Sequence, residues 1–191
     1  MEKGQYGYIK KHKKKIITSI VILGVMILTG VILSLAMFKT TKTLIIILPI
    51  LISLPFAKQI VALIMCSKFK PLSEEDHQKI EKGIHYKNRD GILYDISLSR
   101  YEGMLFFPAV IVRDGRMLFL YQETFGKKIP DVEFLKKEIA RSFEMIKKPY
   151  VIVTALSVDE FIKKAETIKE PDEDYVVKDQ SMREKLFELG V

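Results

Sequence analysis

Three carboxylates lie beside the strands that the sequence predicts in the C-terminal part of the chain. They are Asp95, Asp114 and Glu123. Two carboxylates close to a lysine can hold Mg²⁺ for the hydrolysis of a phosphodiester. These residues are therefore the candidate catalytic and metal-binding set for a metal-dependent phosphodiesterase.

A second candidate metal site involves two histidines and a glutamate. His77, Glu81 and His85 follow one another at intervals of four residues on a predicted helix. Such spacing places them along one side of the helix as a loose ladder of ligands, but the H-E-x-x-H signature of a zinc enzyme is absent. A solvated polar helix face explains the same three residues, and we favour that interpretation.

Other catalytic and cofactor motifs are missing from the sequence. There is no glycine-rich phosphate loop of either common type and no G-x-S-x-G nucleophile motif. The one cysteine, Cys66, lies at the end of an apolar segment, where a Cys–His nucleophile pair is not expected. The sequence predicts no bound cofactor.

The elements that must position these residues fall into two parts with opposite charge. Residues 1–70 contain 11 lysines and one acidic residue, whereas residues 71–191 contain 20 basic and 23 acidic residues. The basic excess thus flanks two apolar segments and does not extend over the remainder. A nucleic-acid partner is not expected, because the C-terminal part lacks the positive field that phosphate backbones require.

The two apolar segments are long enough to span a membrane. Ile16–Phe38 contains 23 residues without a charge, and Thr43–Cys66 contains 24 with one, Lys58. About 20 apolar residues suffice to cross ~30 Å of hydrocarbon. A link of four residues, 39–42, predicts an antiparallel hairpin. We expect an uncleaved anchor at 16–66 with helices at about 16–38 and 43–66.

Lysines at both outer ends of the hairpin predict its orientation. The positive-inside rule places both termini in the cytoplasm, with residues 1–15 as a basic cytoplasmic segment. The lysine cluster also has a second interpretation, which is recruitment of anionic lipid from the bilayer. Lys58 has no acidic partner within the hairpin and is expected to reach the cytoplasmic headgroups. The lysines in and around the hairpin that bear on orientation or lipid contact are Lys10, Lys11, Lys13, Lys14, Lys15, Lys58, Lys68 and Lys70.

Small residues in the first apolar segment indicate a packing face. Gly30 and Ser34 form a small-xxx-small pair, which can seat the second helix or another copy of the chain. Pro49 and Pro55 favour a kink in the second segment. A homo-oligomer assembled through the hairpin is one expectation from this pattern.

Residues 67–191 predict one small cytoplasmic domain of the α/β or α+β class. Its order is α-β-β-β-α-β-α-α, arranged in two or three layers. Ser73 begins the first helix, which runs to about Tyr86, and Asp179–Leu189 is the last helix after an exposed acidic link at 171–174. The strand from Ile92 to Ser99 alternates, with Ile92, Tyr94, Ile96 and Leu98 expected on one face.

Local signals specify several connections in this domain. Asp114-Gly115 predicts a tight hairpin between two apolar strands. Pro108 predicts a bulge or an edge stretch in the first of them. Ser157 and Glu160 form a capping box at the start of a further helix.

The order α-β-β-β-α-β resembles the core of the PD-(D/E)xK nucleases. The hairpin around Asp114-Gly115 resembles that of the nuclease-related domain, which carries Asp before its first apolar strand and Glu-x-Lys at the end of its second. In this chain those places fall near Phe107-Pro108 and at Leu120-Tyr121-Gln122. Glu123 is followed by Thr124 and Phe125, so the Glu-x-Lys element is absent. The resemblance implies a nuclease-like fold without nuclease activity.

The first eight residues, MEKGQYGY, precede a basic run and two apolar helices. This arrangement is similar to an uncharacterised family of small bacterial two-helix membrane proteins. The resemblance implies a bacterial inner-membrane location and brings no known activity. The sequence therefore favours a membrane-anchored, non-enzymatic cytoplasmic module that binds an unknown protein partner or has a regulatory role. The alternative is a membrane-tethered, metal-dependent, nuclease-like hydrolase.

Overall fold

The computed structural model describes residues 3–38, 47–84, 91–100, 103–122, 131–143, 150–169 and 173–189. The chain forms two compact units. One is a helical hairpin, Ile9–Phe69, and the other combines Met1–Tyr8 with Lys70–Val191. The hairpin is thus inserted into the sequence of the α/β unit, because the chain leaves that unit after residue 8 and returns to it at residue 70.

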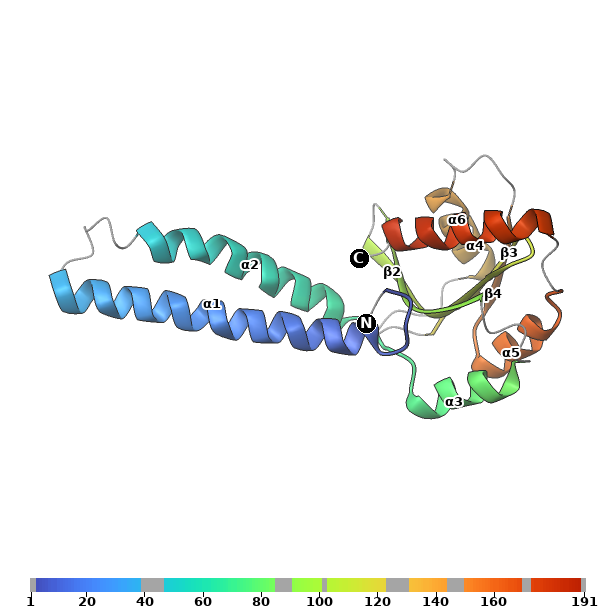
Figure 1. Ribbon diagram of the computed structural model, residues 1–191, viewed down its shortest axis with the longest axis horizontal. Coiled ribbons are helices and arrows are strands. Elements are labelled where there is room, and N and C mark those ends of the chain that lie inside the picture. Colours follow the sequence, from blue (N-terminus) through green and yellow to red (C-terminus); the bar gives the residue numbers. More distant parts are fainter. Residues whose placement is uncertain are drawn as a thin grey trace. The chain divides into compact units, whose positions relative to one another are not determined.

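The hairpin consists of α1 (Tyr8–Phe38) and α2 (Ile47–Ser67), which pack antiparallel (Figure 1). A Cβ atom on Gly30 would lie 2.8 Å from Cγ of Pro49, and one on Gly24 would lie 3.5 Å from the Phe56 ring. Both helices are long and apolar enough to cross a membrane. The first begins eight residues earlier than predicted, since the lysine-rich segment is itself helical.

Small residues of α1 seat α2, which was one of the two alternatives that the sequence left open. Gly30 faces the ring of Pro49, and Ser34 is fully buried. Pro49 lies in the first turn of α2, where a missing N–H costs little, and Pro55 lies inside the helix. The predicted link at residues 39–42 lies outside the described residues.

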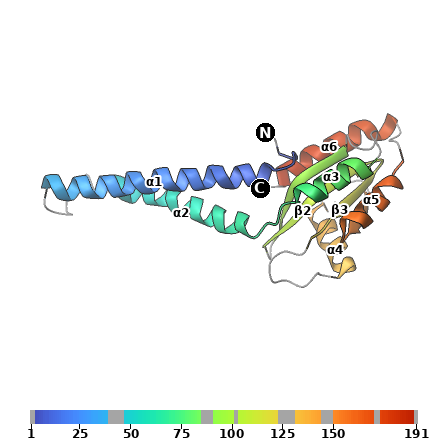
Figure 2. The ribbon, with the colours of Figure 1, turned by 90° about the horizontal axis from the view of Figure 1, so that it is seen from below.

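The second unit is a three-layer α/β domain, in the predicted order. Its sheet has the order β1-β2-β3-β4, with β1, β2 and β3 antiparallel and β4 parallel to β3. Helices α4 and α6 cover one face, and α3 and α5 cover the other (Figures 1 and 2). The elements are α3 (Glu74–Gly83), β1 (Ile92–Arg100), β2 (Gly103–Arg113), β3 (Arg116–Leu120), α4 (Val132–Ser142), β4 (Val151–Ala155), α5 (Val158–Glu166) and α6 (Glu173–Leu189).

Each face of the sheet has its own apolar core. On the α4/α6 face, Phe107 and Phe119 pack with their ring centroids 4.8 Å apart, and Leu135 of α4 is fully buried there. On the α3/α5 face, Leu118 packs with Phe161 of α5 and Ile80 of α3. Burial on both faces explains why β2 and β3 are nearly continuous apolar runs in the sequence.

The predicted alternation of β1 is wrong at its midpoint. Tyr94 packs on the α3/α5 face, whereas Ile96 and Leu98 pack on the α4/α6 face. Between them Asp95 has a left-handed backbone, with φ +54°, and it lies across from Pro108 of β2. Proline cannot donate to the ladder, and a left-handed residue turns the strand, so the side chains exchange faces at this pair.

The start of α3 follows the sequence, whereas the end of α3 and the start of α6 differ from it. The predicted extension of α3 to about Tyr86 is wrong from Ile84, whose backbone is extended. The Ser73 hydroxyl accepts a hydrogen bond from the Asp76 N–H at 3.1 Å, as predicted for an N-cap. Helix α3 ends at Gly83, and residues 85 and 86 of its expected extension lie outside the described residues. Helix α6 begins at Glu173, six residues before the predicted start. Because acidic residues stabilise a first helical turn, the end of the predicted acidic link belongs to the helix.

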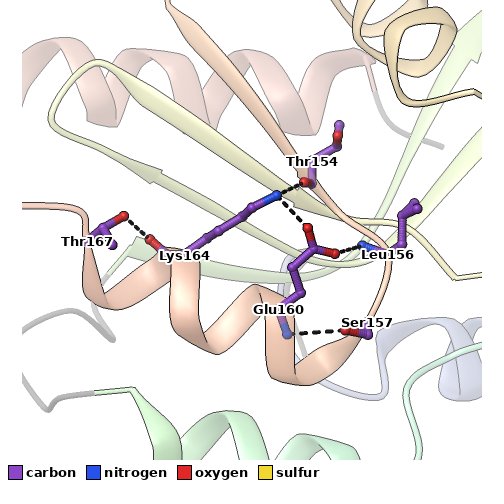
Figure 3. Close-up of polar contacts among 6 residues, drawn as sticks. All are labelled: Thr154, Leu156, Ser157, Glu160, Lys164 and Thr167. Atoms are coloured by element: carbon purple, nitrogen blue, oxygen red, sulfur yellow. Dashed lines mark hydrogen bonds and ion pairs between the residues drawn. The ribbon is translucent and has the colours of Figure 1, made fainter.

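The capping box of α5 has an additional partner (Figure 3). The Ser157 hydroxyl accepts from the Glu160 N–H at 3.2 Å, as predicted. The Glu160 carboxylate accepts from the N–H of Leu156 at 2.9 Å and from Lys164 Nζ at 2.6 Å. Lys164 also donates to the carbonyl of Thr154 at 2.8 Å, which ties α5 to the end of β4.

We expect Glu160→Gln to lower the free energy of unfolding by about 0.5 kcal/mol at neutral pH, because the Glu160–Lys164 pair is partly exposed. Hydrogen bonds from Lys164 and from the Leu156 N–H lower the pKa of Glu160 below its ordinary value of 4.5. The stabilisation is therefore complete above pH 4.5 and is lost as the pH falls through the lower pKa of the folded state. Native-state hydrogen exchange of wild type and variant across this range measures the difference, and a difference that grows in acid would contradict the prediction.

Candidate functional site

Residues 3–8, which extend to the first residue of α1, form an N-terminal strap on the α/β domain. The Gly4 carbonyl accepts the Tyr94 N–H at 2.8 Å in an isolated antiparallel bridge to the outer edge of β1. Lys3 Nζ donates to the carbonyl of Phe187 at 3.2 Å. The strap thus joins the first residues of the chain to the edge of the sheet and to α6.

Glycine is required at the centre of this contact. Gly4 has φ +88°, and a Cβ atom there would lie 2.6 Å from Cε1 of Phe187. A side chain would be strained by the backbone and would also overlap the ring. Gly4, in the opening sequence of the chain, therefore has a structural role.

Aromatic side chains extend the strap contact onto α3. The Tyr6 ring stacks on His77 with centroids 3.9 Å apart, and the Tyr6 hydroxyl donates to the carbonyl of Leu72 at 3.3 Å. Tyr94 lies 4.9 Å from His77 between ring centroids and donates from its hydroxyl to Glu81 at 2.9 Å. The cluster is held by stacking and hydrogen bonds between the strap, α3 and β1.

This cluster contains two of the three predicted ligands of the histidine ladder. His77 Nε2 lies 3.9 Å from a carboxylate oxygen of Glu81, but the ring of His77 is stacked on Tyr6 and Glu81 accepts from Tyr94. His85 lies outside the described residues. Among the residues that the structure describes, no three His, Cys, Asp or Glu side chains are placed to hold a metal ion.

Two of the three predicted catalytic carboxylates, Asp95 and Asp114, lie far apart. Asp95 of β1 lies across from Pro108 of β2. Asp114 lies six residues after Pro108, in the turn that follows β2. At ~3.3 Å per residue these two positions are about 20 Å apart, too far for one metal centre. Glu123 lies outside the described residues.

The places at which the nuclease-related hairpin carries its carboxylates are occupied by core aromatics. Phe107 and Tyr121 belong to the α4/α6-face core, with ring centroids 6.3 Å apart. Asp95 itself is buried beside a cavity of about 10 Å³ that is also lined by Tyr8 and Leu186. This cavity has room for about one water molecule and none for a substrate.

No protein-family model matches this chain, and neither a curated protein nor a solved structure matches it. The arrangement of its own residues must therefore carry any functional conclusion. Two further features of that arrangement, at the β2–β3 turn and along α1, bear on it.

A buried carboxylate, which the sequence did not indicate, organises the β2–β3 turn. Asp179 of α6 is 1% exposed and accepts the N–H groups of Asp114 at 2.8 Å and Gly115 at 3.4 Å. The turn is the predicted tight hairpin, with φ +51° at Asp114 and +65° at Gly115. Burial, reinforced by the charge of Asp179 and its hydrogen bond, raises the pKa of Tyr150 to about 12. One residue of α6 therefore holds both the turn and Tyr150.

We expect Tyr150→Phe to lower the free energy of unfolding by about 1 kcal/mol at neutral pH, through loss of the hydrogen bond to Asp179. Because the folded-state pKa of Tyr150 exceeds the ordinary value of 10, the stabilisation is complete below pH 10 and is lost as the pH rises through about 12. Denaturant titrations of both proteins at increasing alkaline pH should show the difference shrinking. A constant difference would show that Tyr150 does not titrate in contact with Asp179.

Exposed apolar side chains occur in the two segments that contact the same turn, and we call them the turn patch: Val151, Tyr175, Val176 and Val177. Val177 is 75% exposed and Val151 is 59% exposed. The Val151 N–H donates to the Gly115 carbonyl at 3.0 Å, and the Tyr175 ring lies where a side chain at Gly115 would have to be, 2.7 Å from its Cβ position. The start of β4 and the first turns of α6 thus present apolar side chains on either side of one hairpin turn.

The lysines of the predicted topology signal are all in or beside the hairpin helices. Lys10, Lys11, Lys13, Lys14 and Lys15 occupy the first turns of α1, and Lys58 is exposed on α2. Lys68 and Lys70 are exposed just after α2. Three of the α1 lysines, Lys11, Lys14 and Lys15, line one open groove together with Thr18, Ser19, Ile22 and Leu23.

Proposed function

We propose that this protein is a membrane-anchored α/β module that binds a protein partner at the turn patch. The proposal depends above all on the exposure of these four apolar side chains at the start of β4 and in the first turns of α6, two segments that contact the β2–β3 turn. Contiguous apolar surface on a folded domain marks sites of protein interaction. Aromatic and aliphatic residues of this kind supply the central contacts of such interfaces.

The anchor is the hairpin. Large apolar side chains such as Val21, Leu28 and Leu54 are more than half exposed along α1 and α2. Exposure of this kind is costly in water and favourable in hydrocarbon. No acidic residue occurs between Glu2 and Glu74, so no carboxylate has to be buried in the bilayer.

We propose that both termini and the α/β domain lie in the cytoplasm of a bacterial cell. Both ends of the hairpin continue into the same domain, which requires them to emerge on one side. Lysines surround these ends, and the positive-inside rule assigns that side to the cytoplasm. The distance between Asp95 and Asp114 argues against a hydrolase site that uses these two of the three candidate carboxylates together.

Charge-adding variants test whether the turn patch is the binding surface. The double variant V176E/V177E places two carboxylates in the patch, and Q180E/S181E adds the same two charges at exposed positions one turn further along α6. Proteins captured by crosslinking in intact cells, followed by detergent solubilisation, are compared by mass spectrometry. We expect a partner that is retained by wild type and Q180E/S181E and lost from V176E/V177E. Identical sets of captured proteins for all three chains would overturn the assignment of the patch.

Accessibility labelling tests the anchor and its orientation. A single cysteine is placed at Gln180, an exposed position of α6, after Cys66→Ser removes the native thiol. A membrane-impermeant maleimide should label this position only after the cell membrane is opened. Labelling of intact cells would refute the orientation, and recovery of the protein in the soluble fraction without detergent would refute the anchor.

A further inference from the structure

The groove on α1 changes in chemical character along its length. Lysines line its N-terminal end, hydroxyl groups line its middle, and aliphatic side chains line its C-terminal end. It is shallow and open, and it is lined, among the described residues, only by residues of α1: Lys11, Lys14, Lys15, Thr18, Ser19, Ile22 and Leu23. The order of groups repeats the order of a phospholipid from phosphate through ester to acyl chain.

Helical geometry holds this order in register. Because α1 is helical from Tyr8, Lys11, Lys15, Thr18 and Ile22 recur at intervals of three or four residues and share one face. At 1.5 Å per residue, the groove runs about 18 Å along the helix, from Lys11 to Leu23. That length covers the headgroup region and the first part of the hydrocarbon.

The hydroxyl groups have different roles. The Thr18 hydroxyl donates to the Lys14 carbonyl at 3.0 Å, so its proton is used within the helix. Ser19 offers the hydroxyl that can donate to an ester carbonyl. Ile22 and Leu23 then provide the aliphatic wall for an acyl chain.

We propose that this groove binds an anionic phospholipid, with Lys11, Lys14 and Lys15 on the phosphate-containing headgroup. The proposal rests on the hairpin lying in a bilayer, as proposed above. Charge supports it, because the segment from Lys3 to Ser73 contains no acidic side chain that would compete for these lysines. An electrostatic topology signal depends on no particular pair of these lysines, whereas a lipid site depends on the three that line the groove.

Two matched pairs of lysines separate a site from general attraction. K14Q/K15Q removes two lysines that line the groove. K10Q/K13Q removes two lysines from the same segment that do not line it. The full-length protein is purified in detergent, and binding of phosphatidylglycerol and phosphatidylcholine is measured by native mass spectrometry at matched lipid concentrations.

We expect wild type and K10Q/K13Q to bind phosphatidylglycerol in preference to phosphatidylcholine. K14Q/K15Q should bind phosphatidylglycerol about 30-fold more weakly, since each lysine contributes about five-fold. Equal losses in both double variants would show diffuse attraction and overturn the site, as would no loss in either. Competition by inorganic phosphate as effective as the lipid itself would also overturn it, because the aliphatic end of the groove would then contribute nothing.

These outcomes are distinct from failure of the proposed function. If cell fractionation finds the chain in the soluble fraction, the anchor is wrong whatever the lipid measurement shows. If the chain is in the membrane and the two double variants behave alike, the anchor stands and the lipid site is wrong.

Discussion

Replacing Asp179 with alanine is expected to lower the free energy of unfolding of the α/β domain by about 4 kcal/mol. The carboxylate is 1% exposed and accepts hydrogen bonds from two backbone N–H groups of the β2–β3 turn and from Tyr150. Hydrogen bonds to a charged acceptor are among the stronger ones, and their loss leaves buried donors without an acceptor. Native-state hydrogen exchange of the β2 and β3 amides in the full-length protein measures the change.

Glu184→Ala is the matched control for this prediction. It removes an exposed carboxylate from the same helix and should change the free energy of unfolding by less than about 0.5 kcal/mol. A similar small effect for Asp179→Ala would mean that the turn holds its conformation without α6. Asp179→Ala should also lower the pKa of Tyr150 from about 12 towards its ordinary value of 10, because the neighbouring negative charge is gone.

Replacing Gly4 with alanine is expected to release the N-terminal strap. The new Cβ atom would lie 2.6 Å from the Phe187 ring, and the backbone would be held at φ +88°. Overpacking and left-handed strain together cost about 3 kcal/mol. The chain can avoid this cost by undocking residues 3–8, so the Tyr94 amide, which donates to Gly4, should exchange with solvent much faster while the centre of the sheet stays protected.

Gly7 provides the control that separates backbone strain from overlap with the ring. Its φ of +79° is close to that of Gly4, but a Cβ atom at Gly7 has no neighbour within 4 Å. Gly7→Ala should therefore cost only the strain, about 1 kcal/mol, and leave Tyr94 protected. If both alanine variants released Tyr94 equally, the Phe187 contact would not be what fixes the strap.

Features that depend on neighbouring residues in the sequence were predictable. The Asp114-Gly115 turn, the Ser73 cap and the Ser157–Glu160 capping box each use a backbone preference and a side chain within three residues. The order of helices and strands follows from apolar periodicity in the same way. Such signals need no information about the tertiary structure.

Features that depend on distant residues were not predictable from the pattern. The face change in β1 requires Asp95 and Pro108 to lie across from each other, and the pattern of β1 alone favoured a single apolar face. In the sequence, Asp179 does not differ from the other acidic residues of a helix. Its role depends on the β2–β3 turn, whose backbone it contacts. The strap was not foreseen because its partners, Tyr94 and Phe187, are far away in sequence.

The strap also affects when the protein can finish folding. Lys3 contacts Phe187 of α6 across a sequence separation of 184 residues. The strap can therefore dock only after α6 has been synthesised and has packed on the sheet, and contacts between such distant residues form slowly. Docking of the strap is thus a late step of folding that reports on the packing of α6.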